Sequence, residues 1–132
     1  MGLDMYAYSI PMDFISNDYE VDLNQLPEEP VGSKLAYWRK HSALHDFMTE
    51  RYQAKGGEAE SFNCIAMPIT QEDLTLLKSL VQSHTLYHPY QLPTSLYSSA
   101  DLSQLIASDI IFIRDAQELL DAGMGVYYFS WW

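Results

Sequence analysis

LDMYAYSI, the stretch from Leu3 to Ile10, alternates its side chains as a half-buried β-strand does, and Pro11 ends it. The chain closes with a second strand-like stretch, GVYYFSWW (residues 125–132), whose tryptophan pair is too apolar to remain in water. The simplest core pairs these two strands at the centre of one sheet. This pairing organises the rest of the predicted fold.

Two helices are predicted in the middle of the chain from amphipathic repeats and capping signals. The first has Ser42 as its N-cap and ends at the glycine pair 56–57. We interpret the residues from Tyr37 onward as the start of this packed helix, with aromatic, basic and histidine side chains on its surface. The second begins at Thr70, and Asp73 three residues later resembles a capping box.

A third helix is predicted over residues 99–122, and its β-like run Ile110 to Ile113 leaves open a division into two helices. DYEVDL (18–23) is interpreted as a short edge strand, and SFNCIAMPI (61–69) as a further strand. The sequence thus predicts one α+β domain over residues 1–132. About three helices pack on a small antiparallel or mixed sheet in which the N- and C-terminal strands are adjacent.

Charge is the strongest compositional feature. The 132 residues carry 18 acids and 7 bases, a net charge of −11, which disfavours nucleic acid and anionic membranes as partners. The single Cys64 fits a reducing compartment, and no stretch approaches the length of a membrane span. We therefore expect a soluble cytoplasmic protein.

Seven acids and no base precede Lys34. One interpretation is a solvated surface that aids solubility; the other is an acidic face that docks a basic partner. The candidate acidic face comprises Asp18, Glu20, Asp22, Glu28 and Glu29.

YWRKHSALHDFM (37–48) is the densest cluster of chemically interesting side chains. A possible ligand pocket is predicted from Tyr37, Trp38, Arg39, His41, His45 and Asn63. All four histidines form H-x-x-x-H pairs, a weak metal signal, since His41 precedes the expected N-cap and His88 precedes a proline. Cys64 lies in an apolar run, which favours a buried hydrophobe over a nucleophile. No catalytic residue, metal ligand or cofactor is assigned, and none of the phosphate-binding or nucleophile-elbow motifs occurs.

Several segments together resemble a family of small uncharacterised proteins of bacteriophages and prophages. They are the MGLDMY start, the YWRK centre followed by a histidine, the dipeptides NC and PT, and the YYFSWW end. The shared positions are Tyr37, Trp38, Arg39, Lys40, His45, Asn63, Cys64, Pro93, Thr94, Tyr127, Tyr128 and Trp132. The chain departs from the pattern at Ser42, at Phe47 and in PTSLYSS, which lacks the family's glycines. The resemblance implies a phage origin and supplies no activity.

The leading hypothesis is a phage accessory protein that binds a host protein with a basic surface, for example to inhibit a defence or nucleic-acid-handling complex. A second hypothesis is a small enzyme, or a ligand- or metal-binding protein, that uses Arg39, His41, His45 and Asn63. A third is an oligomeric structural protein whose aromatic loop, Tyr87 to Tyr97, forms a contact between subunits. The absence of a catalytic constellation favours the first.

Overall fold

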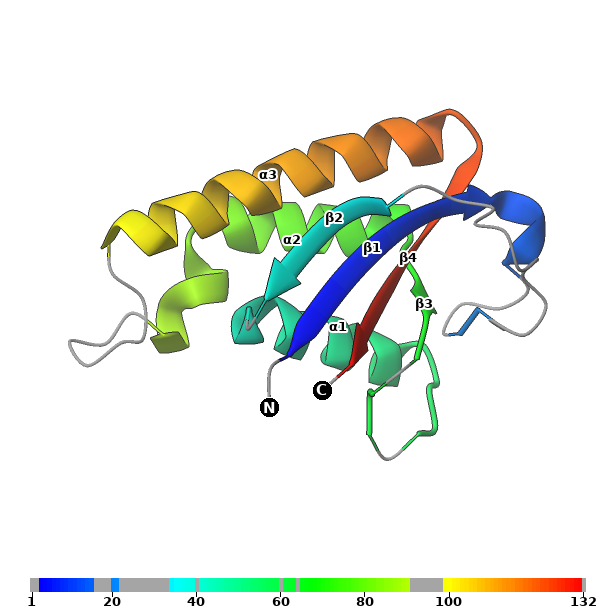
Figure 1. Cartoon of the computed structure of the whole chain (residues 1–132), viewed down its shortest axis with the longest axis horizontal. Helices are drawn as coiled ribbons and strands as arrows, with labels where there is room; N and C mark the ends of the chain where they lie inside the picture. Colours follow the sequence, from blue (N-terminus) through cyan, green and yellow to red (C-terminus); the bar gives the residue numbers. More distant parts are fainter. Residues whose placement is uncertain are drawn as a thin grey trace.

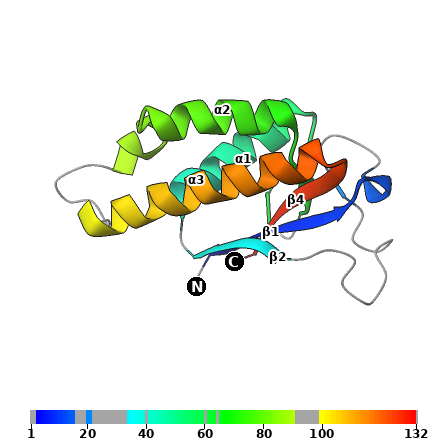
Figure 2. The ribbon, with the colours of Figure 1, turned by 90° about the horizontal axis from the view of Figure 1, so that it is seen from above.

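The computed structural model of the chain describes residues 3–15, 20–21, 34–39, 41–59, 61–63, 65–90 and 99–131. One four-stranded antiparallel sheet, in the order β2-β1-β4-β3, carries three α-helices on one of its faces (Figures 1 and 2). The α+β prediction is therefore confirmed. The elements are β1 Asp4–Pro11, η1 Met12–Phe14, β2 Lys34–Arg39, α1 Ser42–Ala54, β3 Met67–Pro68, α2 Gln71–Gln82, η3 Thr85–Tyr90, α3 Ser99–Asp121 and β4 Met124–Trp131.

The first and last strands form the centre of the sheet. β1 and β4 pair antiparallel along their whole length, from Asp4 opposite Trp131 to Pro11 opposite Met124. The inward residues Met5 and Ala7 of β1 belong to the core beneath the helices. The predicted adjacency of the terminal strands is thus confirmed: β1 largely alternates buried and partly exposed side chains, and β4 is buried over residues 125–128.

Residues 37–39 are a strand and not the start of a helix, so that interpretation was wrong. They belong to β2, which pairs with β1 so that Met5 lies opposite Trp38 and Tyr6 opposite Tyr37. Trp38 packs edge-on against Phe112 of α3, with ring centroids 5.0 Å apart, whereas Tyr37 points to the other face. The aromatic pair favours a strand because each ring can occupy one side of a pleated surface.

The helix α1 begins one residue earlier than its predicted cap, Ser42, implies. His41 is the N-cap, it makes no side-chain capping bond, and Ser42 is the first helical residue. The capping box predicted at α2 is present: the Thr70 side chain accepts from the Asp73 backbone, and the Asp73 side chain accepts from the Thr70 backbone. α3 is one continuous helix, so the apolar run within it causes no break.

The strand predicted over residues 61–69 is shorter than expected, and most of the one predicted over residues 18–23 lies outside the described residues. Of the described residues in 61–69, only Met67 and Pro68 form a strand, and they pair with Tyr128 and Tyr127 in the middle of β4. Of residues 18–23, only Glu20 and Val21 are described; neither is in a strand, and the Val21 backbone N–H donates to the Ala66 carbonyl at 2.7 Å.

Candidate functional site

A buried cluster of polar side chains surrounds Asp109 in the middle of α3. Its carboxylate, 1% exposed, accepts hydrogen bonds from Trp38 Nε1 at 3.1 Å, from His41 Nε2 at 2.8 Å and from the Tyr87 hydroxyl. The three donors come from β2, the start of α1 and η3. Asp109 therefore ties four separate elements together.

The His41 ring is fully buried and stacks on Tyr87, with centroids 6.0 Å apart and planes 12° from parallel. Because its Nε2 faces a carboxylate, that nitrogen carries the hydrogen. Nδ1 has no hydrogen-bond partner in the described part of the chain. A histidine held by an aspartate is the pair that orients a catalytic base, but this ring has no exposed surface from which to meet a substrate. The cluster is structural, and burial beside Asp109 raises the Tyr87 pKa, so the tyrosine remains a donor.

His45 occupies a different environment from His41. Its Nδ1 lies 2.8 Å from the Tyr128 hydroxyl, and its ring stacks on Phe62. Burial lowers the His45 pKa, against an opposing effect of Asp46, and burial raises the Tyr128 pKa. Both pKa shifts favour a neutral imidazole whose Nδ1 accepts a hydrogen bond from the Tyr128 hydroxyl. The two histidines of the first H-x-x-x-H pair thus have separate partners.

The residues of the predicted ligand pocket have different surroundings. Trp38 and His41 meet at Asp109 inside the protein, whereas Tyr37 and Arg39 are exposed side chains of β2. Asn63 is half-buried in the segment that precedes β3. None of the predicted pocket residues lines either of the two grooves described below.

A second buried acid, Asp73, lies at the start of α2. Arg51 Nε donates to it at 2.7 Å, and Lys55 also pairs with it while donating to the Pro68 carbonyl at 2.8 Å. Burial alone would raise the Asp73 pKa, but the hydrogen bonds from Lys55, Arg51 and the Thr70 backbone outweigh it and hold the pKa below its usual range. This group fastens α1 to α2.

The sheet face opposite the helices is rich in aromatic rings. Tyr6 packs against Tyr37 at 5.1 Å and Tyr8 stacks on Tyr127 at 5.3 Å, while Tyr37 is 47% and Trp131 49% exposed. The end of this face beside Tyr8 and Tyr127 packs against other residues, including Ile10, Ile15 and Val21. The end nearer Tyr37 is the more open one.

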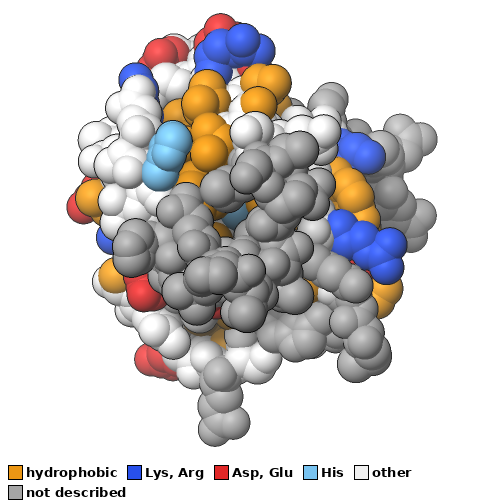
Figure 3. All heavy atoms as spheres, turned by 90° about the vertical axis from the view of Figure 1, so that its left-hand side faces the viewer, with side chains coloured by type: hydrophobic (Ala, Val, Ile, Leu, Met, Phe, Trp, Pro, Cys, Tyr) orange, Lys and Arg blue, Asp and Glu red, His pale blue; other side chains and the backbone are white. Residues whose placement is uncertain are grey.

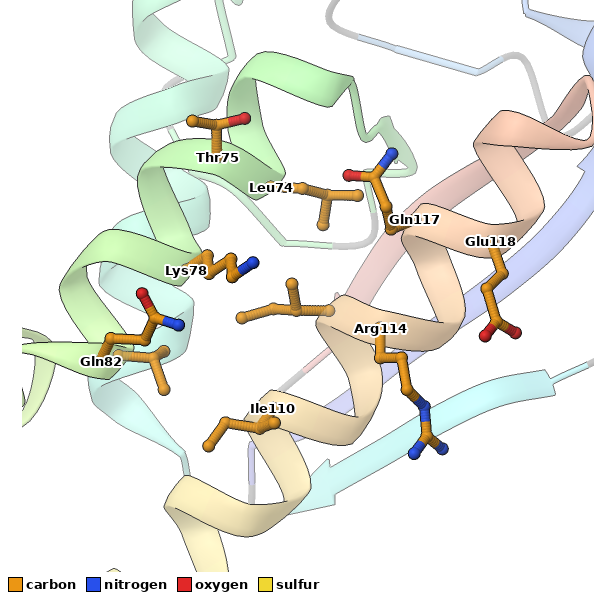
Figure 4. A pocket seen from close by; sticks show the side chains of 10 residues that line it. Leu74, Thr75, Lys78, Gln82, Ile110, Arg114, Gln117 and Glu118 are labelled. Atoms are coloured by element: carbon orange, nitrogen blue, oxygen red, sulfur yellow. The ribbon is translucent and has the colours of Figure 1, made fainter.

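Two grooves lie on the helical side. The larger, about 560 Å³, runs between α2 and α3 over Leu74, Val81 and Ile113. In Figure 4, Lys78 extends from α2 toward α3, whereas Arg114 points away from α2. The smaller groove, about 300 Å³, is lined by Ala43, Asp46, Phe47, Glu50, Leu80, Thr85 and Leu86. Neither groove has a histidine, a cysteine or a serine in its described lining.

Of the predicted acidic face, Glu20 is exposed, and Asp18, Asp22, Glu28 and Glu29 lie outside the described residues. Cys64, Lys40, Pro93, Thr94 and Trp132 lie outside them too. Tyr87, the first residue of the predicted subunit contact, is fully buried, so its side chain does not face a neighbour. In the part of the chain that is described, no three histidine, cysteine or acidic side chains gather as metal ligands, and no helix is long and apolar enough to cross a bilayer.

Comparison of the chain with protein-family models, with curated proteins and with solved structures gave no match. The resemblance to phage proteins therefore stays a prediction.

Asp109 is the principal residue that the sequence analysis missed, and Tyr87 was predicted only as part of an aromatic loop and not as a partner of this acid. A signal for Asp109 exists: it lies three and four residues before Phe112 and Ile113, on the apolar stripe of α3. An acid on such a stripe requires buried partners.

Proposed function

We propose that this chain is a phage-type accessory protein that acts by binding a protein of the host cell through its acidic exterior. The observation that carries this proposal is the distribution of charge. Asp73 and Asp109 are buried, and Arg51 and Lys55 are bound to Asp73. Removing these two acids and two bases from the 18 and 7 of the whole chain leaves sixteen acids against five bases. These four charges balance within the described part of the chain, so the net charge of −11 belongs to the remaining residues.

The positions of the histidines also support binding over catalysis. His41 is bound to a buried carboxylate and His45 to Tyr128, so each has a structural partner. A catalytic base has to reach its substrate within hydrogen-bond distance. His41, with no exposed surface, does not meet that requirement.

An acidic exterior attracts a basic partner from a distance and raises its association rate. Exposed charges are screened beyond about 8 Å at physiological ionic strength. The proposed complex therefore weakens as salt rises. A host protein that handles nucleic acid offers the basic groove that this charge would fill, which is one concrete form of the proposal.

The experiment captures proteins from a bacterial lysate on the immobilised chain at low and at high salt. A variant with Asp18, Glu20, Asp22, Glu28 and Glu29 changed to Asn or Gln is compared with a control variant. The control neutralises five exposed acids elsewhere: Asp13, Glu50, Glu58, Glu72 and Glu118. The proposal expects a captured protein that is lost with the first variant and at high salt and is retained by the control. Capture that is unaffected by salt, or equal for the two variants, would contradict it.

A further inference from the structure

We propose that the free edge of β2 is a second binding site, which accepts an extended acidic segment of another protein as a fifth strand of the sheet. This inference goes beyond the proposed function, because it concerns a different surface and a segment of the opposite charge. It depends on the position of β2 in the sheet, on the exposed side chains of that strand and on their charges.

β2 is an edge strand, and in the described part of the chain its only strand partner is β1. In an edge strand, alternate residues direct their backbone N–H and C=O groups away from the sheet, where an added strand can bond to them. The ligand that satisfies such a row of groups is an extended peptide, because only a strand presents matching donors and acceptors at the same spacing.

The other edge of the sheet is a poorer site. β3 has two residues, Met67 and Pro68; both are buried, and the proline has no N–H to donate. The Pro68 carbonyl already accepts a hydrogen bond from Lys55. The two edges therefore differ, and only β2 is long enough to guide a partner strand.

The side chains of β2 determine the chemistry of that partner. Lys34, Tyr37 and Arg39 are exposed and occupy three successive positions on the outer face, opposite Tyr8, Tyr6 and Asp4 of β1, because the register shifts beside Leu35. The Lys34 ammonium lies 5.8 Å from the centre of the Tyr37 ring. The Asp4 carboxylate accepts from the Tyr37 hydroxyl at 2.7 Å, and neither Lys34 nor Arg39 forms an ion pair within the described residues.

The positive charges of Lys34 and Arg39 are unusual in a chain that has 7 bases and 18 acids. Of the five bases that are not bound to Asp73, three lie together at residues 34–40, and the other two are Lys78 and Arg114. In the view of Figure 3, basic and hydrophobic side chains lie next to one another on the right-hand side. A strand that pairs with β2 therefore gains most when it carries an acid, an apolar residue and an acid on one face, at positions i, i+2 and i+4.

A second copy of the chain is a less suitable occupant. Antiparallel pairing of β2 with itself about its centre would place Lys34 of one copy opposite Arg39 of the other. Like charges directly opposite one another destabilise a strand pair, and lysines on edges protect natural sheets from such pairing. The same cations that oppose self-association favour carboxylates.

The test measures binding of capped peptides to the isotope-labelled full chain by NMR. The probe is TETVTET, and the controls are TKTVTKT, with the opposite charge, and TEPVPET, in which proline removes backbone donors. The expected result is chemical-shift changes at the amides of residues 34–39, with TETVTET binding at least ten-fold more tightly than either control. Equal affinities for TETVTET and TKTVTKT, no binding of TETVTET, or shifts confined to other elements would overturn the inference.

Two charge-reversed variants localise the effect. Lys34→Glu with Arg39→Glu is expected to reverse the preference toward TKTVTKT. Lys78→Glu with Arg114→Glu changes the net charge equally, at the α2–α3 groove, and is expected to leave the preference for TETVTET unchanged. All four side chains are exposed, so both variants should fold, which circular dichroism checks. A preference that changes equally in both variants would show a whole-molecule effect and overturn the site. The titration uses only synthetic peptides and the purified chain. Its outcome therefore does not depend on whether the capture experiment finds a host protein.

Discussion

Two aspartates, Asp73 and Asp109, are equally buried in this protein, each 1% exposed, and yet their surroundings differ. Asp73 is bound by the cationic side chains of Arg51 and Lys55. Asp109 receives its hydrogen bonds from Trp38, His41 and Tyr87, which are aromatic side chains.

The Asp73 group links two helices, whereas the Asp109 group links four elements of the fold. The two cations that bind Asp73 come from the last turn of α1 and from its C-cap, Lys55. Asp73 also lies in the first turn of α2, where the helix dipole stabilises a negative charge. Arg51 remains 18% exposed, so water can replace part of its hydrogen bonding if the Asp73 carboxylate is removed. The donors of Asp109 come from three elements and are fully or almost fully buried, so water cannot replace the carboxylate.

The largest effect is expected from Asp109→Ala. It leaves three buried donors without an acceptor, and each such group costs about 1–3 kcal/mol. We expect a loss of about 4 kcal/mol in the free energy of unfolding, measured by urea titration, and Glu118→Ala on the exposed side of α3 as a control with no comparable loss. If the alanine variant does not fold, Asp109→Asn, which keeps one acceptor oxygen, should lose about half as much. A loss below about 1 kcal/mol for Asp109→Ala would remove the contrast between the two aspartates.

Asp73→Ala is expected to have the next largest effect, about 3 kcal/mol, because it leaves two cations unpaired and removes half of the capping box. The loss is smaller than at Asp109, since Arg51 can turn toward water. The matched control is Glu72→Ala, whose carboxylate is exposed and lies 3.9 Å from Arg51. Equal losses for the two variants would mean that burial contributes nothing to the Asp73 group.

Acid should affect the Asp73 group directly. The Asp73 pKa is lower in the folded than in the unfolded chain, so its contribution is present above the unfolded pKa of about 4 and is lost as the pH falls through the folded pKa. Asp73→Asn should therefore lose less stability than the parent chain between neutral pH and about pH 2. Unfolding titrations across this range check it, and parallel curves for the two proteins would contradict it.

His45 predicts a smaller effect in a different pH window. Its pKa is lowered by burial, so the unfolded chain binds a proton more readily, and stability falls as the pH drops below the unfolded pKa of about 6.5. His45→Gln should flatten the slope of stability against pH just below that value, and NMR titration of the imidazole measures the pKa itself. A His45 pKa at or above the usual value would contradict both the burial and the neutral state inferred for its bond to Tyr128.

The smallest effect is expected from Asp115→Ala. Asp115 pairs with Arg114 at 3.2 Å, but the arginine is 65% exposed, and exposed pairs contribute about 0–1 kcal/mol. We expect a change of at most about 0.5 kcal/mol in the free energy of unfolding. A change as large as that at Asp73 would show that exposure does not distinguish these acids.

The sequence alone determined the elements whose signals are local. The alternation in Leu3 to Ile10 predicted β1, and the Thr70–Asp73 spacing predicted the cap of α2, because pleat and capping geometry involve residues close together in the chain. The adjacency of the two terminal strands followed from the need to bury one face of each.

Only the tertiary structure decided what depends on distant partners. Residues 37–39 form a strand because they pair with β1, and the local preference of their two aromatic side chains for a strand does not identify that partner. The role of Asp109 rests on donors 22, 68 and 71 residues away in sequence. A local sequence does not determine which distant side chains come into contact, because the packing of the whole molecule determines those contacts.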